Sequence, residues 1–240
     1  MPGVATGRTL PVAALAAPAT PTVPTTPRSN PDAGPDHRPH PDQLVAELEQ
    51  LVGVDWPTVW RGVPRDAGKR AHWCAGFGWR PLWFEAGLRV RTPLGGRLYL
   101  AAQAPERPVT RVEHTVWAAR GRHAGENGVV AELAEAHWAA YVTALRGFMG
   151  WPSWNGTWDA PDFPELPGSA AWPSAERRRR QRDPYRLAVW RFRTPGAPLI
   201  ELRTTLDQGS QARPAPANAR ISLACHDPAH AESPRRERLG

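Results

Sequence analysis

The chain has 240 residues, 41% of them hydrophobic, and a formal net charge of +7 at neutral pH. This length and composition predict a single core of moderate size, and no apolar run reaches the roughly 20 residues that a membrane helix requires. Two cysteines, Cys74 and Cys225, are too few for a disulfide framework, although they are enough for a single bridge between them. We therefore expect a soluble, cytoplasmic protein with reduced thiols.

The two ends of the chain differ from its middle. Residues 1–40 carry nine prolines separated mainly by alanine and threonine, so they bury too little apolar surface to offset the entropy of ordering them. We predict disordered tails at 1–40 and 226–240, with one domain over 41–225. An apolar run after Arg8 is similar to a secretory signal, but it is short and contains proline.

Three helical pieces are predicted at the start of the domain. Apolar residues at helical spacing indicate an amphipathic helix over 44–52. Trp56 and Trp60 lie four residues apart, on one face of a second helical turn that Asp55 can cap. A third piece is expected over residues 66–77.

Extended segments follow and predict a meander of three or four antiparallel strands, at residues 79–84, 88–91, 97–101 and 109–119. Simple alternation divides the last segment between two faces. One face is expected to carry Val112, His114, Val116 and Ala118, and the other Arg111, Glu113, Thr115 and Trp117.

The strongest helix signal covers residues 129–149. About 20 residues make a helix of about 30 Å, enough to cross the face of a sheet. Its apolar stripe is predicted from the spacing of the side chains. The stripe comprises Val130, Leu133, His137, Tyr141, Ala144, Leu145 and Phe148, widened by Val129, Ala136 and Ala140.

The remaining segments complete an α+β fold. Residues 187–193 and 199–204 predict a second hairpin, 206–218 a mobile linker, and 219–225 one more strand. The order of elements predicts a single antiparallel sheet, built from the meander and the C-terminal hairpin and covered on one face by the long helix.

A Trp- and Pro-rich stretch, residues 150–175, is expected to form an irregular loop. Its rings and carboxylates could form a stacking platform for a sugar, a base or a peptide side chain, or a hydrolase site in which one carboxylate acts as acid or base. Packing of the rings as a lid on the sheet edge is the favoured alternative. The residues concerned are Trp151, Trp154, Asn155, Trp158, Asp159, Asp162 and Glu165.

Most of the positive charge is local. An Arg-rich segment over 176–186 belongs to the stretch 176–193, which has a local net charge of +6. Its arginines could contact nucleic-acid phosphates, with Tyr185 or Trp172 stacking on bases, but no known nucleic-acid-binding motif accompanies them and a solvated surface is favoured. The candidate arginines are Arg177, Arg178, Arg179 and Arg180.

Catalytic and metal-binding patterns are weak. Residues 72–74 and 225–227 hold thiol and imidazole groups, but neighbours in sequence do not make a spatial triad. Glu132, Glu135 and His137 lack the spacing of a metal-binding helix. We therefore assign no catalytic residue, cofactor or metal.

The layout of residues 44–205 resembles that of small uncharacterised actinobacterial α+β proteins. The similarity is carried by Gly78-Trp79-Arg80 at the sheet entry, Met149-Gly150-Trp151-Pro152 at the end of the long helix, and Trp190 in the returning strands. The insertion over 151–172 and the proline-rich N-terminus depart from it. The resemblance implies a non-enzymatic, immunity-like or chaperone-like partner of a secreted toxin or effector.

Overall fold

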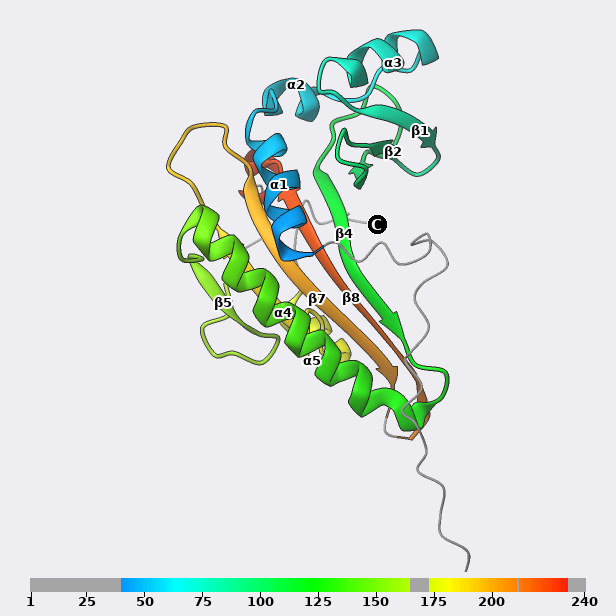
Figure 1. Ribbon diagram of the computed structural model, residues 1–240, viewed down its shortest axis with the longest axis vertical. Helices are drawn as coiled ribbons and strands as arrows, with labels where there is room; N and C mark the ends of the chain where they lie inside the picture. Colours follow the sequence, from blue (N-terminus) through cyan, green and yellow to red (C-terminus); the bar gives the residue numbers. More distant parts are fainter. Residues whose placement is uncertain (1–39, 165–172, 211, 233–240) are drawn as a thin grey trace, which may run out of the picture.

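The computed structural model describes residues 40–164, 173–210 and 212–232, and the structural statements below concern these residues (Figure 1). Of the predicted tails at 1–40 and 226–240, residues 1–39 and 233–240 lie outside the described residues, as do Glu165 and Trp172.

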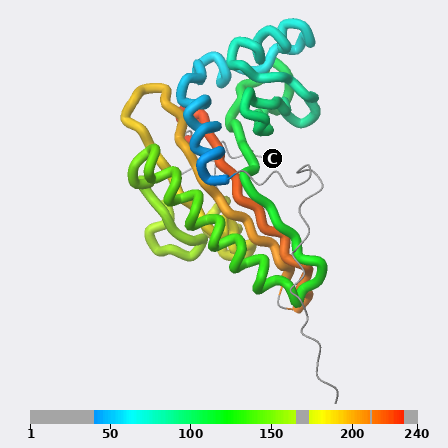
Figure 2. The backbone as a smooth tube through the Cα atoms, viewed as in Figure 1, coloured from blue at the N-terminus to red at the C-terminus, as the bar shows by residue number. Residues whose placement is uncertain are grey.

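One eight-stranded sheet organises the fold and confirms the predicted α+β class (Figures 1 and 2). Its strand order is β1-β2-β3-β4-β8-β7-β6-β5, and neighbouring strands are antiparallel throughout. β8 therefore lies near the middle of the sheet although it is the last strand in sequence. The strands are β1 (Arg80–Phe84), β2 (Leu88–Arg91), β3 (Arg97–Ala101), β4 (Arg111–Arg120), β5 (Trp154–Thr157), β6 (Arg186–Trp190), β7 (Leu199–Gly209) and β8 (Pro214–His226).

The described residues also form six α-helices. They are α1 (Pro41–Val52), α2 (Trp56–Arg61), α3 (Ala67–Ala75), α4 (Asn127–Met149), α5 (Ala175–Gln181) and α6 (Pro228–Glu232). The predicted covering helix is α4, which contacts β4, β6, β7 and β8 and has α1 packed beside it (Figure 1). In the part of the chain that the structure describes, no helix has both the length and the apolar character of a membrane span.

The main core lies between α4 and the central strands. Apolar residues alternate along β8 and face this core, and Leu223 pairs with Leu202 of β7. The predicted stripe of α4 was partly wrong, because Val129 and Phe148 are exposed and Trp138 is buried. Spacings of three and four keep the buried residues on one side of the helix. They are Val130, Ala134, Trp138, Tyr141, Val142 and Leu145.

A β-bulge in β4 changes which of its side chains face the core. The pairing with β8 passes from Thr115 opposite Ser222 to Trp117 opposite Ile221, so Val116 is an extra residue in β4. The Trp117 side chain is 3% exposed, and its ring centroid lies 4.9 Å from that of His137 on α4. The prediction from alternation was wrong from Trp117 onward, because an inserted residue reverses the faces that follow, whereas Val116 is buried in the main core with Val112.

The predicted linker over 206–218 is part of the longest hairpin. β7 continues to Gly209 and β8 begins at Pro214. Gly209 has a φ of 71°, and a Cβ there would lie 2.5 Å from the carbonyl oxygen of Arg213. The polar, Pro-containing composition suggested a loop, but backbone pairing between two long strands overrides that local preference. The predicted tail from 226 also begins with ordered structure, the short helix α6.

Candidate protein-binding surface

The Trp-rich stretch contains a strand. Trp154–Thr157 form β5, an edge strand that pairs with β6, and Trp154 lies opposite Val189. The prediction of an irregular loop over 150–175 was wrong at these residues. The four residues of β5 lie between Pro152 and Pro161. They are enough to extend an existing sheet, because their backbone hydrogen-bond partners come from β6.

The second half of the stretch packs as a lid. The Trp154 side chain is half-buried, and its ring centroid lies 5.0 Å from that of Phe163, edge to face. Phe163 is 5% exposed and joins Leu187, Val189 and Leu199 in a small second core. Leu187 and Val189 alternate along β6 with residues of the main core, so this second core lies on the sheet face opposite α4.

Arg178 belongs to this lid. It lies on α5, which the side chain of Ser174 caps, and it is 5% exposed. Its guanidinium carbon lies 3.8 Å from the centroid of the Phe163 ring, and its Nε donates a hydrogen bond of 2.9 Å to the carbonyl oxygen of Trp158. The expected arginine surface is therefore incomplete at this position, because one of its four arginines packs inward.

The other arginines of α5 do stay on the surface. Arg177, Arg179 and Arg180 are exposed, and the Arg177 Nε donates a hydrogen bond of 2.9 Å to the Gln181 side chain. A helix of seven residues presents these three charges over a short length.

The carboxylates of the stretch lie at the surface. Asp159 is exposed and accepts a hydrogen bond of 2.6 Å from the Thr157 hydroxyl, which closes the turn after β5. Asp162 is also exposed. Trp158 is half-buried, with the Arg182 guanidinium 5.9 Å from its ring centroid. The structure thus places these carboxylates on a turn and not among apolar rings.

The Cys225 thiol and the His226 imidazole lie on opposite faces of the sheet. Cys225 points into the main core, whereas the His226 Nε2 lies 3.0 Å from Glu201 Oε2 on the opposite face of the sheet. Burial raises the pKa of the free Cys74 thiol to about 11 and that of Cys225 to about 12. Both thiols are therefore protonated at neutral pH and poor nucleophiles. Among the described residues, no group of three His, Cys, Asp or Glu side chains could hold a metal.

Trp151, in contrast, faces solvent on a fixed support. Its side chain is 77% exposed, and the Arg146 guanidinium carbon lies 3.3 Å from the centroid of the indole ring. The preceding Gly150 has a φ of 80° and ends α4, and its carbonyl oxygen accepts a hydrogen bond of 3.0 Å from Trp190 Nε1. The hydrogen bond at Gly150 and the stacking on Arg146 therefore both support this exposed position of the ring.

Two more aromatic residues are exposed at this end of the molecule. Phe148 is 38% exposed one turn before Trp151, and Phe192 is 42% exposed two residues after Trp190. The C-terminal end of α4 and the loop between β6 and β7 rise at the same end (Figure 1). We call Arg146, Phe148, Trp151 and Phe192 the aromatic end patch.

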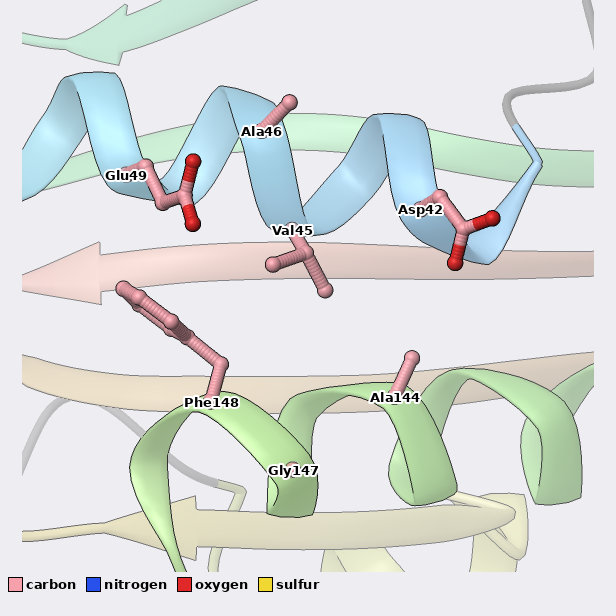
Figure 3. Close-up of a pocket in the computed structure, with 7 residues that line it drawn as sticks. All are labelled: Asp42, Val45, Ala46, Glu49, Ala144, Gly147 and Phe148. Atoms are coloured by element: carbon pink, nitrogen blue, oxygen red, sulfur yellow. The ribbon is translucent and has the colours of Figure 1, made fainter.

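A shallow groove runs from this patch between α1 and α4 (Figure 3). Its volume is about 390 Å³. The side chains of Val45 and Phe148 project from the two helices into the space between them. We call this feature the α1–α4 groove, and the residues that line it are Asp42, Val45, Ala46, Glu49, Ala144, Gly147 and Phe148.

Comparison of the chain with protein-family models, with curated proteins and with solved structures gives no match.

Proposed function

We propose that this chain is a non-enzymatic protein-binding module, immunity-like or chaperone-like, and that its partner contacts the aromatic end patch. The observation that carries the proposal is Trp151, a large apolar ring that is 77% exposed at the end of the longest helix. Large rings are usually buried, so a ring that is held outward by specific contacts supports an intermolecular role.

The chemistry of the patch suits a protein partner. Tryptophan and arginine dominate the residues that contribute most to protein–protein binding, and Trp151 and Arg146 are stacked here. Phe148 and Phe192 add two further exposed apolar rings, on the end of α4 and on the loop between β6 and β7. A flat indole stacked on a guanidinium can fill an apolar pocket of a partner while the guanidinium bonds to partner carbonyl or carboxylate groups.

The hydrogen bonds that hold the backbone on either side of Trp151 favour tight binding of a partner. Binding is weakened when loops and side chains must first be ordered. Here Gly150 is fixed by the Trp190 indole, and Ser153 is fixed by its backbone and hydroxyl bonds to the Val189 carbonyl. Trp151 therefore lies between two anchored residues, and little ordering remains to be done on binding.

The test is capture of the partner by full-length protein. The candidate partner is the product of a neighbouring gene, co-expressed with tagged wild-type chain or with Trp151→Ala. We expect a stable complex with the wild type and at least a tenfold weaker one with Trp151→Ala, because loss of a central tryptophan costs about 2 kcal/mol or more of binding free energy.

The matched control is Trp83→Ala. Trp83 is 49% exposed on β1, at the opposite edge of the sheet, and also has an arginine near its ring, Arg89 at 5.6 Å. Binding that survives Trp83→Ala and fails with Trp151→Ala supports the patch. Equal binding by both variants, or no complex with the wild type, would reject it.

A further inference from the structure

The α1–α4 groove opens beside Phe148 of the aromatic end patch. We propose that this groove binds an α-helix of the partner protein, one that carries two basic residues seven positions apart and an apolar stripe between them. The inference rests on the proposed protein-binding function and specifies the chemistry of the segment that is bound.

Small residues in the lining of the groove allow a helix to approach closely. They are Ala46 from α1 and Ala144 and Gly147 from α4. A Cβ built on Gly147 would meet nothing within 4 Å, so the space above this glycine is empty. Small residues let a neighbouring helix approach to the usual interaxial distance of about 8 to 10 Å, with its apolar side chains against Val45 and Phe148.

The backbone of the groove favours a helix over an extended peptide. Both walls are the sides of helices, where N–H and C=O groups are already bonded within the helix. An extended peptide lying there would find no backbone partners, whereas a helix satisfies its own backbone groups. α1 and α4 run in the same direction, as their labelled residues show (Figure 3), so a third helix can lie along both.

The charge of the groove specifies the rest. Asp42 and Glu49 line its α1 side, both are exposed, and no basic side chain is among the lining residues. Asp42 lies 3.2 Å from the exposed His40, and no ion pair of Glu49 is found within the described ranges. The two carboxylates are seven residues apart, about two helical turns or 10 Å. A partner helix alongside α1 opposes both with basic residues at positions i and i+7 and presents apolar residues at i+3 and i+4 to the floor.

The probe is a displayed library of helical peptides, selected on the full-length chain. We expect the enriched sequences to carry Lys or Arg at i and i+7 around an apolar stripe. A selected peptide should bind Gly147→Leu at least tenfold more weakly, because leucine fills the floor while also favouring the helix. The matched control is Gly128→Leu, at the other end of α4, where an added Cβ also meets nothing within 4 Å; its binding should equal that of the wild type.

A charge swap tests the recognition directly. The double variant Asp42→Lys/Glu49→Lys should bind the selected peptide at least tenfold more weakly, and a peptide with Glu at the same two positions should restore binding. Three outcomes overturn the proposal: enriched peptides that bind Gly147→Leu as well as the wild type, a homodimer that Gly147→Leu dissociates, or enriched sequences that are Pro-rich, as the sequence of residues 1–39 is.

Failure of the groove can be told apart from failure of the proposed function. If Trp151→Ala abolishes capture of the partner and Gly147→Leu leaves it unchanged, the aromatic end patch stands and the groove is rejected. If neither variant weakens capture, the proposed surface is itself wrong.

Discussion

Trp151 and Trp154 lie three residues apart and have opposite surroundings. Trp151 is 77% exposed above Arg146, whereas Trp154 lies in an edge strand with its ring against Phe163. Both follow α4, in the same Trp- and Pro-rich stretch. The difference arises from a distant segment, because β6 pairs with Trp154–Thr157 and supplies the core that Phe163 covers. In such a stretch, the partner strand decides which ring packs and which ring is presented.

Phe163→Ala should have the largest effect on this division. Phe163 is 5% exposed between the Trp154 ring and the Arg178 guanidinium, so its removal leaves a cavity that neither neighbour can fill. We expect a loss of about 3 kcal/mol in the free energy of unfolding, measured by urea denaturation. A loss below 1 kcal/mol would mean that the second core does not hold the lid.

Trp154→Ala should cost about 2 kcal/mol, less than a fully buried tryptophan because the ring is half-buried. The effect should overlap with that of Phe163→Ala, since the two rings are in contact. A double-mutant cycle by urea denaturation measures this coupling, and purely additive losses would show that the contact contributes nothing.

Arg178→Met should cost about 1 to 2 kcal/mol, because methionine keeps the apolar stem and removes both the bond to the Trp158 carbonyl and the cation above Phe163. The control is Arg179→Met, the exposed neighbour on α5, which should leave the free energy of unfolding nearly unchanged. Equal losses from the two variants would contradict a structural role for Arg178.

Trp151→Ala should have the smallest effect on stability, within about 0.5 kcal/mol of the wild type, because an exposed ring loses little contact on truncation. The same denaturation series that measures Trp154→Ala provides the comparison. A destabilisation as large as that of Trp154→Ala would identify Trp151 as part of the fold and remove the main support for the aromatic end patch.

The parts of the fold that were predicted correctly depend on local pattern. The helix over 129–149 and the meander over 79–119 have periodic apolar residues, which a sequence shows directly. The errors lie where partners distant in sequence decide the outcome. The extra residue Val116, the strand Trp154–Thr157 and the hairpin over 206–218 all depend on pairing with strands that the local sequence does not specify.

The candidate surface was predicted only in part. Trp151 was named together with Trp154 and Trp158, and nothing in their spacing separates the exposed ring from the packed ones. The α1–α4 groove was missed, although a signal exists: α1 has Val45 and Val52 in addition to the leucines that it buries, and α4 has Phe148 beyond its buried side. Apolar residues in excess of what one buried face requires are the pattern to look for.

The position of β8 has a consequence for folding during synthesis. Until the ribosome has made the last strand, the N-terminal meander and the strands β5 to β7 share no strand pairing, because in the described sheet β8 lies between β4 and β7. Two incomplete sheets, each with an unpaired edge strand, can join only after β8 has been synthesised. Such late, long-range strand pairing is slow and prone to misassembly. A nascent chain that stalls before residue 214 therefore carries both halves of the sheet without the strand that unites them.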